Sequence, residues 1–158
     1  MMTVETRPAT PDDAAALCKL SLLLGYETSA ETMRHRIKAL DKSGGAAVFV
    51  AVHPSDGVVG WVHITRQRRL TSDAFGEIVG LVVVPAFRRK GVGRVLLNRV
   101  MMWSESHGVA DIRVRVQAHR RGAHNFYESM GYTLLKDQRV YHRHTPVPDA
   151  DTRPTLVD

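Results

Sequence analysis

The sequence predicts one α/β domain of the mixed α+β type, with a six- to seven-stranded mixed sheet and helices on both faces. Three observations lead to this prediction. Apolar runs of strand length alternate with segments of helical periodicity. One strand–helix–strand unit is long enough to connect two parallel strands. The 158 residues suit a single domain, and no linker or repeat divides them. We assign the domain to residues 1–144 and expect a disordered tail at 145–158, which has little apolar surface to bury.

The N-terminal part is predicted to form a short strand and two helices. The strand candidate is residues 4–7. Thr10 is a favourable N-cap, and the proline and two aspartates after it suit a first helical turn. The first helix therefore begins there and ends at Gly25. The second helix begins at its N-cap Ser29 and ends at Gly44.

The middle of the chain predicts a hairpin and a central strand. Residues 46–52 and 58–65 are apolar, β-branched runs on either side of the turn-forming segment 53–57. Residues 77–84 are apolar on both faces, as expected of a strand in the centre of a sheet. Gly80 inside this strand indicates a bulge or a close backbone approach.

The C-terminal part is predicted to contain two helices and three strands. Helix 91–107 has apolar residues at helical spacing. Together with strand 111–116 it completes a crossover from the central strand to a parallel neighbour. A short helix follows at 123–130. The last two strands are predicted at 132–135 and 138–142, and they bring the sheet to six or seven strands.

Charge and cysteine content restrict the class of protein. The formal net charge of +6 favours an anionic partner. Nucleic acid is not expected, because aromatic side chains are not interleaved with the arginines. The longest uncharged apolar run, 78–87, is about half as long as a membrane-spanning helix, so no membrane association is predicted. Cys18 is the single cysteine, which fits a reducing compartment. With no signal-peptide pattern at the start, a cytoplasmic location is predicted.

The segment 81–94 has the clearest functional signal. An apolar strand runs into the basic, glycine-containing loop RRKGVGR at 88–94, which begins a helix. A helix N-terminus presents unpaired N–H groups and the positive end of the helix dipole, so it can bind an anion. Glycines allow the backbone to approach a phosphate closely. The alternative is a plain strand–turn–helix with solvated basic side chains. Neither the P-loop spacing nor the dinucleotide-binding fingerprint is present.

Two motifs in this order resemble the signatures of one known family. The spacing Arg88-x-x-Gly91-x-Gly93 after an apolar strand resembles the acetyl-CoA signature of the GNAT superfamily. The run AHNFYESMGY at 123–132 is similar to a second signature of that family. The resemblance covers residues 3–142. It implies a GNAT-like domain that transfers an acetyl group from acetyl-CoA to a primary amine by direct attack in a ternary complex.

The resemblance also implies how acetyl-CoA, the co-substrate, binds. The pyrophosphate would lie on the loop N–H groups, and the pantetheine arm would pair with the preceding strand, like an added strand. The implied cofactor-binding residues are Leu81, Val82, Val83, Arg88, Arg89, Lys90, Gly91, Val92, Gly93, Arg94 and Tyr127. One position departs from the family: many members have an asparagine where this chain has Arg120, so that contact is not transferred.

Acetyl transfer to an amine needs a base, an acid and an oxyanion donor. An alkyl ammonium is free base only about once in a few thousand molecules at neutral pH. The resemblance assigns Tyr127 as the acid that protonates the leaving thiolate, and Glu77 as the base. The alternatives are that Tyr127 packs in a helix core and that Glu77 is a solvated strand end. A bulge at Gly80 could turn the N–H of Val82 or Val83 toward the oxyanion.

Histidines provide further base candidates in the C-terminal half. They are His119, His124 and His142, each of which could instead be a surface or packing residue. His142 and His144 lack a third ligand nearby in the sequence, so no metal site is predicted.

The acceptor is the least defined part of the prediction. It is expected against the helices at 11–41 and the loop 66–76. Glu27 and Glu31 could attract a cationic acceptor, or they could form a solvated helix face. We favour a small-molecule amine. A protein lysine or N-terminus, and a non-catalytic acyl-CoA-binding module, are the alternatives, and a homodimer is left open.

Overall fold

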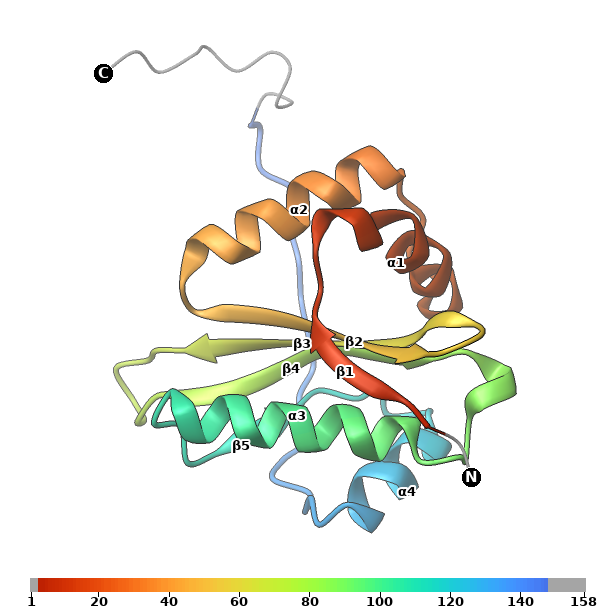
Figure 1. Ribbon diagram of the computed structural model, residues 1–158. Coiled ribbons are helices and arrows are strands. Elements are labelled where there is room, and N and C mark those ends of the chain that lie inside the picture. The colour runs from red at the N-terminus through yellow and green to blue at the C-terminus, as the bar shows by residue number, and fades with distance from the viewer. Residues whose placement is uncertain (1–2, 148–158) are drawn as a thin grey trace.

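A computed structural model describes residues 3–147 and arranges them around one five-stranded sheet (Figure 1). The strands lie in chain order across it: β1 Glu5–Pro8, β2 Ala46–His53, β3 Gly57–Gln67, β4 Phe75–Val83 and β5 Ile112–Val114. Neighbours from β1 to β4 are antiparallel, whereas β4 and β5 are parallel. The predicted mixed sheet, its hairpin and its parallel crossover are therefore confirmed.

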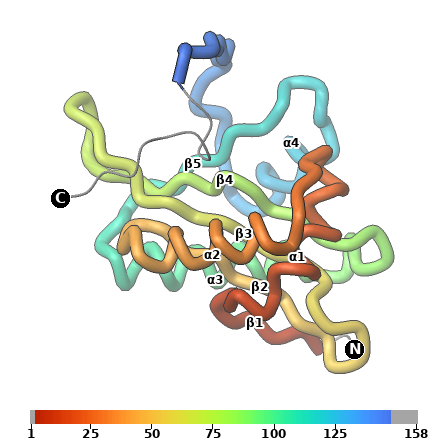
Figure 2. The backbone as a smooth tube through the Cα atoms, turned by 90° about the horizontal axis from the view of Figure 1, so that it is seen from above, coloured from red at the N-terminus to blue at the C-terminus, as the bar shows by residue number. Residues whose placement is uncertain are grey.

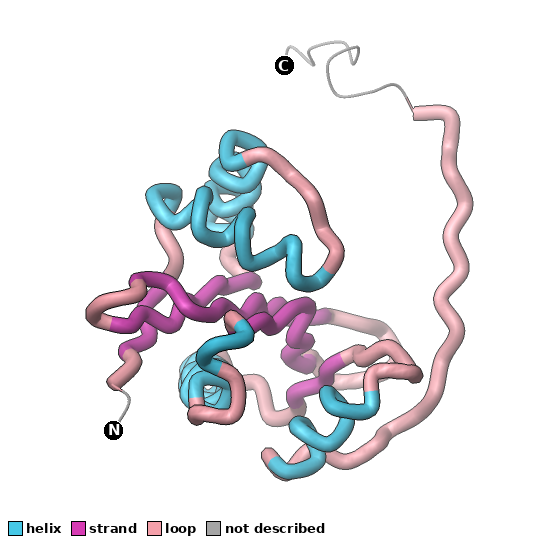
Figure 3. The backbone as a smooth tube through the Cα atoms, turned by 90° about the vertical axis from the view of Figure 1, so that its right-hand side faces the viewer, coloured by secondary structure: helices cyan, strands magenta, loops and turns pink. Residues whose placement is uncertain are grey.

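Helices cover both faces of the sheet, as predicted (Figures 1 and 3). The helices are α1 Ala14–Ser21 and α2 Ala30–Ser43 on one face, and α3 Val92–Ser106 and α4 Arg121–Ser129 on the other. Three short 3-10 helices accompany them: η1 Pro11–Asp13, η2 Leu22–Leu24 and η3 Pro85–Phe87. The first predicted helix is thus three successive elements. None of the helices in the described part of the chain is long and apolar enough to cross a bilayer.

Two apolar cores attach these helices to the sheet. The larger core packs α3 against one face of the sheet, and its buried members include Val62, Ile64, Ile78, Leu96 and Val100. The smaller core packs α1 and α2 against the other face, through Leu17, Ile37 and Val50. Because alternate strand residues point to opposite faces, both cores can draw on the same strands.

A bulge and an open edge interrupt β4. His63 pairs with Gly80 and Ile64 pairs with Ile78, so Val79 is an extra residue in β4. This confirms the bulge predicted at Gly80. The pairing of β4 with β5 stops at Ile78 and Val114. Residues 79–83 therefore have no strand partner on the edge that faces β5.

The final strand pair is a wrong prediction. Residues 133–147 contain no strand, so the sheet has five strands rather than six or seven. This segment is exposed throughout and passes beside the sheet (Figure 2), from the α4 side to the side of α1 and α2 (Figures 1 and 3). Its β-branched and aromatic residues have strand propensity, but a strand also needs a neighbouring edge, and this segment pairs with none. Most of the predicted tail, 148–158, lies outside the described residues.

Candidate active site

The loop between β4 and α3 forms a backbone anion site. Gly91 is the N-cap of α3, with φ of 90°, and Arg89 is also in the left-handed region, with φ of 60°. The first α3 hydrogen bond runs from Val95 N–H to Gly91 O at 3.1 Å. The N–H groups of Val92, Gly93 and Arg94 therefore have no helical acceptor and are available to an anion.

A pocket of about 280 Å³ opens in front of these N–H groups. Four predicted cofactor-binding residues line it: Arg89, Gly91, Gly93 and Arg94. The opposite wall belongs to the end of α4, with Phe126, Ser129 and Met130. The two sequence motifs, separated by a helix and a strand, thus meet at one pocket with a positive rim and an apolar wall.

The side chains of Arg88 and Lys90 contact neighbouring parts of the protein. Arg88 Nε donates a hydrogen bond to the Val83 carbonyl at 3.1 Å, which fixes the loop to the end of β4. The Lys90 ammonium lies 5.7 Å from the centre of the Phe87 ring. Neither residue lines the pocket. These two side chains contact the end of β4 and η3, and so they stabilise the conformation of the loop.

Gly93 is needed for packing between helices. A Cβ built at Gly93 would lie 2.8 Å from Cζ of Phe126, closer than side chains tolerate. Any larger residue would force the Phe126 ring out of this contact. Phe126 is half-buried against the larger core, as expected for a packing residue. The glycine signature therefore serves the helix contact as well as the anion site.

Tyr127 lies next to this contact in a largely apolar setting. Its ring meets Phe126 and Tyr132 edge-on, with centroids 5.2 and 5.5 Å apart. Burial, assisted by Tyr132 and opposed by Arg120, raises the pKa of Tyr127 to about 12. The phenol is therefore protonated at neutral pH, as a proton donor must be.

Glu77 is buried on β4, beside the point where β4 and β5 separate. It is 7% exposed, so the prediction of a solvated strand end is not supported. Arg115 Nε donates to Glu77 Oε1, and Arg115 also donates to Gln138 Oε1 at 3.0 Å. This ion pair compensates a buried carboxylate that would otherwise be costly. Sequence reasoning missed Arg115, because its partner is distant along the chain.

The histidines differ in their surroundings. His119 and His142 are exposed, and His124 Nε2 lies 3.0 Å from the Gln117 carbonyl. His63, which sequence reasoning missed, lies opposite Gly80 on the neighbouring strand. Its Nε2 is buried without a hydrogen-bond partner, and burial lowers the pKa of His63. His63 is thus a half-buried imidazole beside the β4 bulge, and burial favours its uncharged form.

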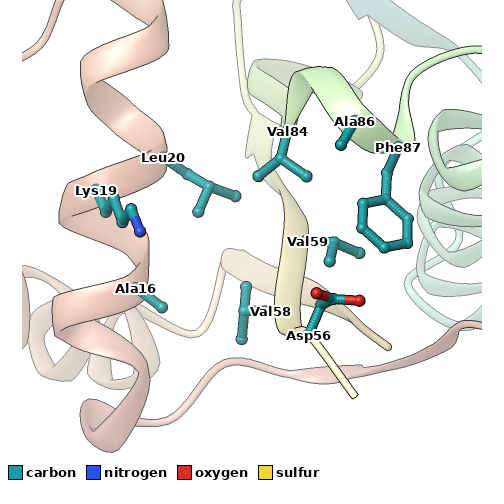
Figure 4. A pocket seen from close by; sticks show the side chains of 9 residues that line it. All are labelled: Ala16, Lys19, Leu20, Asp56, Val58, Val59, Val84, Ala86 and Phe87. Atoms are coloured by element: carbon teal, nitrogen blue, oxygen red, sulfur yellow. The ribbon is translucent and has the colours of Figure 1, made fainter. Parts of the chain in front are cut away.

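A second pocket, of about 360 Å³, lies between α1, the β2–β3 hairpin and η3 (Figure 4). Leu20, Val59 and Val84 surround it, and its charged members are Lys19 and Asp56. No predicted site residue lines it. The predicted acceptor residues Glu27 and Glu31 are exposed and do not line it either.

Comparison with known proteins gives one family. Residues 15–132 match the model of the Acetyltransferase (GNAT) family. Aminoglycoside N(6')-acetyltransferase type 1 of Stenotrophomonas maltophilia is 28% identical to the chain over 148 residues. That alignment covers 91% of this chain and 95% of the relative.

Solved structures share the fold at low identity. Aminoglycoside 6'-N-acetyltransferase AAC(6')-Ih from Acinetobacter baumannii has a TM-score of 0.80 at 12% identity, covering 90% of this chain and 99% of that one. AAC(6')-Iy, in complex with the bisubstrate analogue CoA-S-monomethyl-acetylneamine, has a TM-score of 0.77 at 16% identity, with the same coverage. The likeness confirms the predicted fold type, with five strands here in place of six or seven.

Proposed function

Because the chain belongs to the GNAT family of acetyltransferases, we propose that it transfers an acetyl group from acetyl-CoA to the primary amine of a small molecule, by direct attack in a ternary complex. The observation that supports this most is the arrangement around β4. An anion pocket lies at one end of an unpaired strand edge, and a buried carboxylate lies at the other. The aminoglycoside acetyltransferases named above, which align with about nine tenths of this chain, favour a small-molecule acceptor.

We assign acetyl-CoA binding to the loop and the open edge. The pyrophosphate accepts hydrogen bonds from the N–H groups of Val92, Gly93 and Arg94, and Arg89 adds charge at the pocket rim. The pantetheine amides pair with the unpaired edge of β4 at 81–83, as a short added strand would. This brings the thioester to the bulge at Val79 and Gly80.

The proposed chemistry requires two proton transfers. The amine nitrogen attacks the thioester carbonyl carbon, and the C–S bond then breaks. Glu77 orients a water chain that carries the amine proton to bulk solvent, since transfer from an ammonium to a carboxylate is about six pKa units uphill. Tyr127 protonates the departing thiolate. The N–H of Val82 or Val83, turned by the bulge, donates to the oxyanion.

Two-substrate kinetics test this proposal. Thiol release from acetyl-CoA would be followed with a panel of primary amines, varying both substrates. Direct attack predicts intersecting double-reciprocal lines. Parallel lines would instead indicate an acetylated enzyme, for which Cys18 is the one cysteine available. Cys18→Ser should therefore retain full turnover. No thiol release with any amine would remove the catalytic proposal and favour a non-catalytic acyl-CoA-binding module.

A further inference from the structure

Three arginines gather at the start of β4. Phe75, the first residue of β4, is 1% exposed, and two guanidinium groups lie over its ring. The guanidinium carbons of Arg69 and Arg113 are 5.2 and 4.0 Å from the ring centre. Arg115 binds Glu77, two residues further along β4. We call Arg69, Arg113 and Arg115 the arginine cluster.

The arginine cluster lies on the face of the sheet opposite the anion pocket. Ile78 packs with α3, so its neighbour Glu77 points to the face covered by α1 and α2. Phe75 shares the face of Glu77, and Arg113 is the register partner of Glu77 on β5. Figure 3 shows α3 and α4 on one side of the strands and the other two helices on the far side. The arginine cluster therefore borders the face opposite a thioester held from the α3–α4 side.

The charge of the arginine cluster is only partly balanced. Arg113 Nε pairs with Asp111 at 2.8 Å, and Arg115 pairs with Glu77. No ion pair among residues 3–147 includes Arg69. Asp111 and Glu77 are thus each paired with one arginine, whereas no carboxylate in the described part of the chain pairs with Arg69. A cationic acceptor would meet net positive charge here, whereas an anion would meet planar, fixed donors.

We propose that the acceptor amine also has an anionic group, a carboxylate or a phosphate, which Arg69 and Arg113 bind while the amine lies beside Glu77. This inference rests on the proposed function, because it assigns the acceptor of the same acetyl transfer. A strand rises about 3.3 Å per residue, so the Cα atoms of Phe75 and Glu77, which carry the two ends of the site, are about 7 Å apart. That spacing fits an amine and an anion several bonds apart, and it disfavours an α-amino acid.

Acceptors that differ only in charge or in length test the proposal. The series is glycine, 4-aminobutyrate and 6-aminohexanoate, each compared with its carboxamide. We expect kcat/KM for 6-aminohexanoate to exceed that of its carboxamide, and that of glycine, by about tenfold, the gain of one charge-assisted contact. Glucosamine 6-phosphate compared with glucosamine shows whether phosphate is the preferred anion. Equal values for acid and amide, or a preference for the polycation kanamycin, would overturn the proposal.

A pair of neighbouring variants locates the effect. Arg69→Gln should raise KM for 6-aminohexanoate about tenfold and leave its kcat, and the KM of the carboxamide, unchanged. Arg68→Gln, in the same exposed loop but outside the arginine cluster, should change neither value. An equal rise in KM for acid and amide in Arg69→Gln would mean that Arg69 only covers Phe75, and the proposal would fail.

A binding measurement distinguishes the failure of this inference from the failure of the proposed function. If amines without an anionic group are acetylated as well as the amino acids of the series, the acceptor assignment fails and the proposed acetyl transfer stands. If no amine is acetylated, the proposed function fails. In that case the melting temperature in the presence of CoA still tests whether the arginine cluster binds an anionic group. A rise with 6-aminohexanoate in the wild type that is absent in Arg69→Gln supports the site, and no rise in the wild type overturns it.

Discussion

The two faces of β4 form their sites by different means. On the α3–α4 side, the anion site consists of backbone N–H groups at one helix start, and its shape depends on glycines in a short segment. On the α1–α2 side, the charged groups are side chains from the β3–β4 loop, β4 and β5 with the residue after it, and the neutral Gln138 of the C-terminal segment contacts one of them. The first kind of site is fixed by local geometry, whereas the second depends on contacts distant along the chain.

This difference has a consequence for substrate choice. Backbone donors persist through most substitutions, so the cofactor side tolerates sequence change except at its glycines. Side-chain donors can be exchanged one at a time. If the faces have the proposed roles, the acceptor side can change charge without loss of acetyl-CoA binding, and a relative that acts on aminoglycosides does not fix the acceptor of this chain.

The largest expected effect comes from Gly91→Glu. A carboxylate at the start of α3 would occupy the anion site and repel the pyrophosphate. We expect the affinity for acetyl-CoA to fall by at least about a hundredfold, equivalent to the loss of about two charge-assisted contacts. The measurement is the rise in melting temperature on addition of acetyl-CoA, which should vanish in the variant.

Gly25→Glu is the matched control for that experiment. Gly25 has φ of 85°, close to the 90° of Gly91, and no atom lies within 4 Å of the Cβ built at either position. Both variants thus carry similar backbone strain, but Gly25 follows η2, away from the loop. An unchanged acetyl-CoA shift in Gly91→Glu, or an equal loss in both variants, would remove the loop from the cofactor site.

Tyr127→Phe tests the acid and should have the next largest effect. The variant keeps the ring and its edge-on contacts but removes the proton donor. We expect kcat to fall by about ten- to a thousandfold while acetyl-CoA affinity changes little. Tyr132→Phe is the control, since that ring lies 5.5 Å from Tyr127 in the same cluster. Turnover at the wild-type level in Tyr127→Phe, with chemistry limiting the rate, would reassign Tyr127 to packing.

Glu77→Gln should lower kcat by about tenfold at neutral pH, because it removes the carboxylate that orients the proposed water chain but keeps the side-chain shape. Part of the activity should return at pH 9, where more of the amine is already free base. Asp111→Asn, which removes the partner of Arg113 instead, should show no such recovery. A uniform loss at every pH would indicate positioning, and no loss would turn attention to His63.

How well each region could be predicted from the sequence follows the same division between local geometry and contacts distant along the chain. The crossover from β4 through α3 to β5, the helix start at Gly91 and the bulge at Gly80 were predictable, because glycine placement and apolar periodicity act locally. The Arg115–Glu77 pair was not, since the two residues are 38 positions apart. Nor was the packing role of Gly93, which depends on Phe126 of a later helix.

The error in the C-terminal segment has a related cause. Leu134, Leu135, Val140 and Tyr141 have the composition of strands, and this local signal predicted two of them. All four are more than half exposed, from 65% to 83%. Local propensity indicates that a segment can form a strand, but only a neighbouring edge makes it one. The catalytic roles of Tyr127 and Glu77 stay predictions until the variants above are measured.

The smallest effect on catalysis is expected from Asp13→Asn, which weakens the attachment of the α1–α2 layer. Asp13 accepts two hydrogen bonds from Arg7 of β1, at 2.8 and 2.9 Å, and one from Thr10 N–H at 2.8 Å. Its loss should lower the free energy of unfolding by about 2 kcal/mol, as for a buried, charged hydrogen-bonding group. Acetyl-CoA affinity of the folded variant should be unchanged, because the anion site lies on the other face.

The pH dependence of that loss provides the check. The hydrogen bond from Arg7, partly opposed by burial, holds the pKa of Asp13 below its usual value of 3.8. A depressed folded-state pKa stabilises the fold above pH 3.8, and this contribution disappears as the pH falls through the folded value. The difference between wild type and Asp13→Asn in urea unfolding should therefore be constant at neutral pH and shrink below about pH 4. The exposed Asp12→Asn should match the wild type throughout. A difference that persists at pH 2, or a weaker acetyl-CoA affinity in Asp13→Asn, would show that the two faces are not independent.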